Sequence, residues 1–242
     1  MNPEFAAQLT LAAYMFAAFA VIWRQAARCE HGYQVWLLYV VNRLYCILRC
    51  HWRANRRCPF PDDGPALIVA NHRSPVDPML LWMNHHLAGS RYRIRAINFL
   101  MAREFYEVPS LRWMFRALRS ISVDREASES VPVRTAIRRI QAGELLGVFP
   151  EGRINTGDGL LQPGIGIAFL ALKTQAPVYP VFIHNAPQGK SMVSSFLKRN
   201  RVRLTYGDPV DLSEYYGRRN SHELLEEVTC LLMSQLTELS RL

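Results

Sequence analysis

Short apolar runs alternate with longer segments of helical periodicity beyond residue 65. The runs are partly β-branched and bounded by turn residues, which is typical of buried strands. The segments between them repeat apolar residues every three or four positions, which is typical of helices packed on one face. We predict strands at 66–71, 95–101, 120–124, 145–149, 178–184 and 201–206. We predict helices at 77–88, 104–118, 131–142, 164–175 and 220–240. This alternation predicts an α/β fold in which helices cover a layered sheet.

The amino-terminal pattern is different, because the stretch from Phe5 to Trp23 is apolar and carries no charge. As a helix it would be about 28 Å long, close to the hydrocarbon thickness of a bilayer. The residues before it, Met1 to Glu4, carry no positively charged side chain, which argues against a signal peptide. We therefore predict a membrane-spanning or membrane-embedded helix.

A second apolar stretch runs from Val35 to Leu48 and is rich in aromatic residues. It is short for a membrane span, so we predict an interfacial helix or a helix packed on the first one. A turn-rich segment follows at 59–65, Pro-Phe-Pro-Asp-Asp-Gly-Pro. We place a domain boundary there, between a membrane-associated helical pair (1–58) and an α/β domain (59–242).

The chain of 242 residues carries a net charge of +9, most of it from arginine. Seven arginines and one acid, Glu30, lie between Arg24 and Arg57. Arginine binds phosphate and carboxylate groups well, which suggests nucleic acid, an anionic membrane or a phosphorylated substrate as partner. No zinc-finger spacing or RNA-binding signature is present, so we predict no nucleic-acid partner. A basic cluster beside a membrane helix favours a cytoplasmic position for the folded domain. A solvated basic linker is the alternative.

The five cysteines are odd in number and loosely spaced, at Cys29, Cys46, Cys50, Cys58 and Cys230. The paired spacing of structural zinc sites is missing. We predict free thiols in a reducing compartment and no metal site.

Candidate chemistry begins with Asn71-His72-Arg73-Ser74-Pro75-Val76-Asp77-Pro78, directly after the first predicted strand. Ligands bind at strand ends in open α/β sheets, and a histidine held by a carboxylate makes a general base at neutral pH. On one straight helix His72 and Asp77 would lie about 140° apart, so a turn must bring them together. The alternative is a helix N-cap at Asp77 beside an ordinary strand-end histidine.

Three further blocks follow predicted strands or begin one: Ser122-Val123-Asp124-Arg125, Phe149-Pro150-Glu151-Gly152-Arg153 and Ala176-Pro177-Val178-Tyr179-Pro180-Val181. Together with the His-x4-Asp block, their order resembles the glycerolipid acyltransferase family of the 1-acyl-sn-glycerol-3-phosphate (lysophosphatidic acid) acyltransferase type. The resemblance covers roughly residues 66–181. It implies a fold like that of glycerol-3-phosphate acyltransferase.

The resemblance also implies residue roles. His72 and Asp77 would be catalytic, and Arg125 would bind the phosphate of the acceptor. A surface pair between Arg125 and Asp124 is the alternative. Glu151 and Gly152 would help to bind the acceptor.

Three details of these blocks need their own interpretation. Arg153 stands where the family often has threonine, which leaves the acceptor headgroup open. Ser74 is an unfavoured nucleophile, because no Gly-x-Ser-x-Gly surrounds it. Proline cannot donate to a sheet ladder, so we interpret Pro177 and Pro180 as part of a sheet edge.

The resemblance implies that an acyl group passes from acyl-CoA or acyl-carrier protein to the free hydroxyl of a lysophospholipid. The simplest acceptor is 1-acyl-glycerol-3-phosphate, which would give phosphatidic acid. No cofactor is implied. Another acceptor, such as a lyso-ornithine lipid, and a non-catalytic protein that binds anionic lipid are the alternatives. The sequence does not indicate the oligomeric state.

Overall fold

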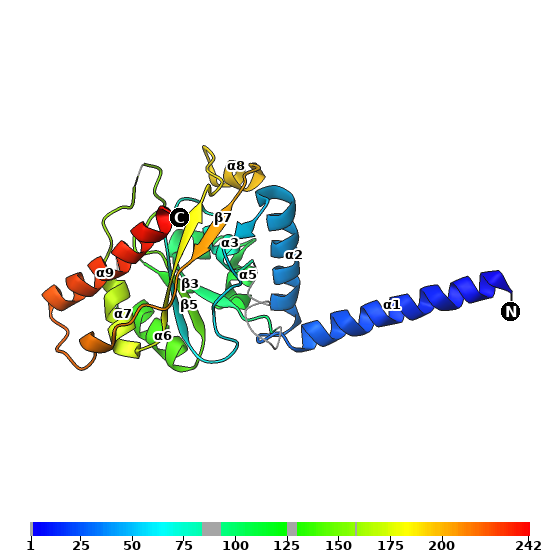
Figure 1. The fold of residues 1–242 in the computed structure, drawn as a ribbon, viewed down its shortest axis with the longest axis horizontal. Helices are drawn as coiled ribbons and strands as arrows, with labels where there is room; N and C mark the ends of the chain where they lie inside the picture. Colours follow the sequence, from blue (N-terminus) through cyan, green and yellow to red (C-terminus); the bar gives the residue numbers. More distant parts are fainter. Residues whose placement is uncertain (1, 84–92, 125–129, 158) are drawn as a thin grey trace.

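The computed structural model describes residues 2–83, 93–124, 130–157 and 159–242. Its centre is a mixed sheet in the order β1-β7-β6-β2-β5-β3-β4 (Figure 1). The strands are β1 (Arg53–Ala54), β2 (Ala66–Ala70), β3 (Ile97–Ala102), β4 (Ile121–Val123), β5 (Leu145–Val148), β6 (Val178–His184) and β7 (Arg203–Tyr206). The predicted α/β fold is confirmed.

Five neighbouring strands, β6, β2, β5, β3 and β4, run parallel to one another. β7 pairs antiparallel with β6, and β1 pairs parallel with β7. The carboxyl ends of the five parallel strands therefore meet at one edge of the sheet, together with the beginnings of β7 and β1. His72 follows β2 at this edge.

Helices cover both faces of the sheet. They are α1 (Pro3–Ala27), α2 (Tyr33–Cys50), α3 (Asp77–Leu81), α4 (Arg103–Tyr106), α5 (Arg112–Ala117), α6 (Ser130–Gln141), α7 (Gly166–Thr174), α8 (Met192–Leu197) and α9 (His222–Ser240), with a 3₁₀ turn at Ser213–Tyr215. β2 is buried along its whole length, as a strand covered on both faces should be. Ile68 belongs to the core on the side of α2 and α3, whereas Leu67 belongs to the core under α6, α7 and α9.

Two predicted helices differ from the structure. The predicted helix 104–118 is divided into α4 and α5, with Pro109 between them. Proline lacks an N–H group and cannot continue the hydrogen-bond ladder. The predicted helix 77–88 begins correctly at Asp77, but α3 ends at Leu81, and residues 84–88 lie outside the described residues. We did not predict β1, α8 or the 3₁₀ turn.

Our interpretation of Pro180 as an edge residue is wrong. Pro180 lies in β6, between β2 and β7, and is the partner of Val69. The carbonyl oxygen of Pro180 accepts a hydrogen bond from Gly207 N at 2.9 Å, so the backbone of Pro180 faces the β7 side. β7 has ended at Tyr206 by this point. The missing N–H group of Pro180 therefore costs the pairing with β2 nothing.

α1 projects away from the rest of the molecule and has no buried residue (Figure 1). Its length and composition are sufficient to cross a membrane. α2 packs one face against the core through Val35, Tyr39 and Cys46. Its opposite face is also apolar but exposed, at Leu37, Val40, Val41, Leu44, Ile47 and Leu48. The exposed stripe of α2 therefore continues the apolar surface of α1.

Arg95 connects the helical pair to the sheet domain. Its side chain is 1% exposed. The guanidinium donates to Glu30 Oε2 at 3.1 Å, in the turn between α1 and α2. It also donates to the carbonyl oxygens of Pro61, Gly64 and Gly143. The proposed boundary at 59–65 stays a prediction. Arg95 joins this segment both to the turn between α1 and α2 and to Gly143 of the sheet domain.

Candidate active site

The end of β2 is fastened to β6 by Asn71. The side-chain oxygen of Asn71 accepts a hydrogen bond from Ile183 N at 2.7 Å, and its amide nitrogen donates to Ile183 O at 3.1 Å. The Asn71 side chain thus makes the two hydrogen bonds to Ile183 that the backbone of a neighbouring strand would make. The chain therefore leaves the sheet in a fixed direction immediately before His72.

The next six residues form the turn that the sequence required. His72 Nδ1 lies 2.9 Å from Asp77 Oδ2. The same carboxylate oxygen accepts hydrogen bonds from the backbone N–H groups of Arg73 and Ser74, each at 2.7 Å. α3 begins at Asp77, with Pro78 in its first turn. The N-cap of α3 is Val76, one residue before Asp77, so the alternative of a helix N-cap at Asp77 is wrong. The Asp77 carboxylate instead pairs with His72.

Burial acts on the carboxylate of this pair. The side chain of Asp77 is fully buried, whereas that of His72 is 17% exposed. Burial raises the pKa of Asp77, and the hydrogen bonds from His72 and from the N–H groups of Ser74 and Arg73 oppose this rise. Asp77 therefore faces the protein interior and His72 faces the site.

The imidazole ring is held on its flat side as well. It stacks on Phe149, with 4.2 Å between ring centroids and 14° between planes. Phe149 stacks in turn on Phe99 at 5.7 Å. Nδ1 is occupied by Asp77, and none of the described residues hydrogen-bonds to Nε2. The ring is thus oriented with Nε2 as the nitrogen left for chemistry.

Glu151 holds the backbone of His72. Its Oε1 accepts a hydrogen bond from His72 N at 2.8 Å, and its Oε2 accepts from Asn155 Nδ2 at 2.9 Å and from Leu161 N at 3.0 Å. Asn155 N donates to His72 O at 2.7 Å. The loop after β5 therefore clamps His72 at both its N–H and its C=O.

Sequence reasoning missed the role of Asn155, which is buried at 2% exposure. Its position four residues after Glu151 carries no recognisable signal. It also missed the stacking by Phe149, although Phe149 belongs to a block that the sequence singled out. Glu151 is engaged by the chain in this structure, and its predicted contact with an acceptor stays a prediction.

Ser74 is placed as a structural residue. It is fully buried, and its hydroxyl donates to Pro187 O and accepts from Val76 N at 3.2 Å. Its neighbour Arg73 accepts a hydrogen bond from Gln188 Nε2 at 3.2 Å. The segment after β6 thus supports the turn from His72 to Asp77 from outside.

The remaining predicted residues are less enclosed. Gly152 has a φ of +63°, in the left-handed region where glycine is favoured. Arg153 is exposed. Arg125 lies outside the described residues. Asp124, its alternative partner, accepts a hydrogen bond from Arg103 at 3.0 Å.

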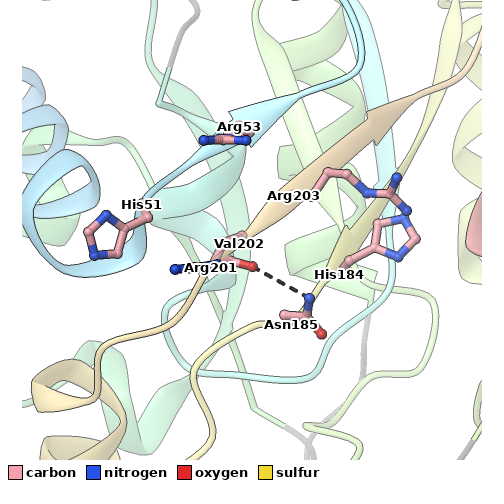
Figure 2. A pocket seen from close by; sticks show the side chains of 7 residues that line it. All are labelled: His51, Arg53, His184, Asn185, Arg201, Val202 and Arg203. Carbon is pink, nitrogen blue, oxygen red and sulfur yellow. Dashed lines mark hydrogen bonds between the residues drawn. The ribbon is translucent and has the colours of Figure 1, made fainter.

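A concave region lies at the same edge of the sheet as His72, beyond β6 (Figure 2). This basic pocket has a volume of about 490 Å³ and is lined by His51, Arg53, His184, Asn185, Arg201, Val202 and Arg203. It contains none of the predicted site residues. His184 Nε2 lies 2.9 Å from Thr205 Oγ1, and burial together with Arg203 lowers the pKa of His184.

Comparison with known proteins supports the motif-based interpretation. The model of the Acyltransferase family matches residues 52–184. A 1-acyl-sn-glycerol-3-phosphate acyltransferase from Bacillus subtilis (strain 168) is 25% identical over 179 residues, which cover 74% of this chain and 83% of the relative. A protein of the same name from Streptococcus pneumoniae (strain ATCC BAA-255 / R6) is 22% identical over 209 residues, covering 86% and 70%.

A solved structure has the same fold. The crystal structure of the 1-acyl-sn-glycerophosphate acyltransferase PlsC from Thermotoga maritima superposes with a TM-score of 0.64 at 22% sequence identity. The match covers 99% of this chain and 98% of that chain, so it includes the amino-terminal helices.

Proposed function

Because the chain belongs to the Acyltransferase family and is therefore an acyltransferase, we propose that it acylates the free hydroxyl of a lysophospholipid. The proposed acceptor is 1-acyl-glycerol-3-phosphate, and the product is phosphatidic acid. Both relatives described above carry the name of this reaction. The proposed donor is a thioester, acyl-CoA or acyl-carrier protein. The observation that carries the proposal is the 2.9 Å contact between His72 Nδ1 and Asp77 Oδ2.

His72 is the proposed general base. Its Nε2 takes the proton of the acceptor hydroxyl while that oxygen attacks the thioester carbonyl. Asp77 accepts the Nδ1–H hydrogen bond, which fixes the tautomer and stabilises the imidazolium. When the tetrahedral intermediate collapses, the C–S bond breaks, the ester remains, and the departing sulfur receives the proton from His72. No nucleophile from the protein is needed.

Glu151 is a proposed positioning residue. It holds the N–H group of His72 through one carboxylate oxygen and Asn155 through the other. A misplacement of about 1 Å costs a catalytic group much of its rate advantage. The N–H groups of Arg73 and Ser74 donate to Asp77. We therefore propose that other groups donate hydrogen bonds to the developing oxyanion.

Arg125, Gly152 and Arg153 form the proposed acceptor end. β4 ends at Val123 and is part of the parallel set, so its carboxyl end points to the same edge as that of β2. Arg153 is exposed beside the loop that carries Glu151. Guanidinium groups bind phosphate with two hydrogen bonds each, which suits a phosphomonoester headgroup.

The proposed location is the membrane, with the catalytic domain on the cytoplasmic side. α1 is apolar, exposed and long enough to be embedded. Acyl-CoA and acyl-carrier protein are cytosolic donors, which agrees with this orientation. The proposed division of the chain is a membrane-associated helical region at 1–58 and the acyltransferase domain at 59–242.

The test uses purified full-length protein with labelled acyl-CoA, acyl-carrier protein and a panel of lysolipids. We expect phosphatidic acid from 1-acyl-glycerol-3-phosphate, and about 10³-fold slower formation by His72→Ala. A preference for a lyso-ornithine lipid or for a lysolipid with a larger headgroup would contradict the proposed acceptor, whereas the proposed acyl-transfer mechanism would be unchanged. Lipid binding without transfer from either donor in the wild-type protein would contradict the proposal as a whole.

A further inference from the structure

α8 is a short helix whose outer face is apolar. Ser191 caps it, because its hydroxyl accepts a hydrogen bond from Ser194 N. Ser195 is buried and Phe196 packs against the core. The side chains that face outward are Met192, Val193 and Leu197, which are 38%, 67% and 63% exposed. In a water-facing helix these positions would be polar.

α8 is attached to the carboxyl end of α2, although they are far apart in sequence. Tyr45 donates a hydrogen bond to Phe196 O at 3.0 Å, and the two rings lie 6.1 Å apart. Arg49 donates to Leu197 O. α8 therefore lies next to the carboxyl end of α2, the helix that carries the exposed apolar stripe, and is drawn above it in Figure 1.

The chain around α8 is basic and lacks acids. From residue 159 to residue 207 there is no aspartate or glutamate. Five cations lie near α8 in the sequence: Lys190, Lys198, Arg199, Arg201 and Arg203. Two of them, with Arg53 from β1, line the basic pocket (Figure 2). An apolar face bordered by cations complements an anionic lipid leaflet, whose headgroups are negative and whose interior is apolar.

We propose that α8 is a second membrane contact, which inserts Met192, Val193 and Leu197 into the interface of an anionic leaflet. This rests on the membrane association in the proposed function. α1 and α2 would provide the first contact, and the basic pocket would face the headgroups.

The position of α8 gives this contact a role in acyl transfer. The segment between β6 and α8 touches the catalytic turn, because Gln188 donates to Arg73 O and Ser74 donates to Pro187 O. Lys198, directly after α8, donates to Gln188 O at 3.0 Å. Seating α8 in the leaflet would therefore hold the His72 turn at the depth of the acceptor hydroxyl.

A depth measurement tests the proposal directly. A fluorophore is attached at Val193→Cys in full-length protein, in a Cys230→Ser background because Cys230 is the exposed cysteine. The vesicles contain phosphatidylglycerol and lipids with a nitroxide on the acyl chain. We expect at least a twofold loss of fluorescence at position 193.

Val131→Cys is the matched control. Like Val193, Val131 is the second residue of its helix, and it is 60% exposed. α6 covers the other face of the sheet, because Ala136 and Ile140 belong to the core under α7 and α9, whereas Phe196 of α8 packs against the core of α2 and α3. We expect no quenching at position 131. Equal quenching at both positions, or none at either, would overturn the proposal. The same probe in His72→Ala should still be quenched, so this result does not depend on acyl transfer.

A second variant pair tests the role in transfer. Val193→Asp should lower the rate on acceptor in anionic vesicles about fivefold and leave the rate on a short-chain acceptor in solution unchanged, while Val131→Asp should change neither. If Val193→Asp lowers both rates equally, α8 acts by supporting the His72 turn and not by contacting the membrane. If it lowers neither, α8 does not contact the leaflet during turnover. Either result would contradict the proposal.

Discussion

The turn from His72 to Asp77 and the basic pocket lie at the same edge of the sheet but are constructed in opposite ways. In the turn, one oxygen of Asp77 accepts three hydrogen bonds, and Glu151 holds the backbone of His72. In the pocket, Arg53, Arg201 and Arg203 are exposed. The difference indicates that the turn is held rigidly by the chain, whereas the pocket presents its positive charges to solvent.

The largest predicted effect is the loss of the base in the turn. His72→Ala should lower the rate of acyl transfer about 10³-fold, within the range that general bases contribute. The measurement is product formation from labelled acyl-CoA at saturating acceptor. His222→Ala is the control, since His222 is exposed on α9. If His72→Ala retains more than about a tenth of the activity, His72 is not the base.

The next largest effect concerns the orientation of that base. Asp77→Asn should lower the turnover rate about 10²-fold, with little change in the KM of the acceptor, because Asp77 is buried behind the ring and does not reach a ligand. A change confined to KM would place Asp77 in acceptor binding and contradict this interpretation.

Asp77→Asn also allows a prediction of how the free energy of unfolding depends on pH. The pKa of Asp77 is raised in the folded chain above the ordinary value of 3.8, so the folded state holds this proton more tightly than the unfolded chain does. Ionisation of Asp77 therefore disfavours folding as pH rises above 3.8. The free energy of unfolding of wild type, relative to that of Asp77→Asn, should therefore fall as the pH rises above 3.8. Urea titrations of both proteins check the sign, and a rise would refute it.

A smaller effect is expected from the support of the turn. Glu151→Gln keeps the shape and one acceptor oxygen but weakens the charge-assisted hydrogen bonds to His72 N and Asn155. The rate should fall about tenfold, as expected for a loss of roughly 1–2 kcal/mol of positioning. The rate constant at saturating substrates is the measurement. Glu151→Asp, which is too short to reach both partners, should be worse than Glu151→Gln.

The smallest effect on the chemistry is expected in the pocket. Arg53→Gln with Arg201→Gln should leave the rate on a short-chain acceptor in solution within about twofold, because exposed charges contribute little at a distance under screening. Binding to phosphatidylglycerol vesicles should weaken and lose part of its salt dependence. Cosedimentation at two salt concentrations measures this. A large loss of solution activity would show that the pocket belongs to the catalytic site.

The sequence predicted the parts of the molecule that local patterns determine. β6 was predicted with its observed ends, and the turn from His72 to Asp77 followed from Pro75 within it and Pro78 directly after it. Long-range relations were less accessible. The placement of Pro180 inside the sheet depends on where β7 ends, which no local pattern at 180 records. The clamp from Asn155 and the attachment of α8 to α2 likewise join residues whose spacing carries no periodicity.

The buried guanidinium of Arg95 has a mechanical consequence. Because it donates hydrogen bonds both to Glu30, in the bend after α1, and to Pro61, in the linker before β2, it fixes this bend to the sheet domain. With α1 in a bilayer as proposed, this connection would fix the height of the His72 imidazole above the bilayer. The molecule would then select lipids by the depth of their unesterified hydroxyl below the membrane surface.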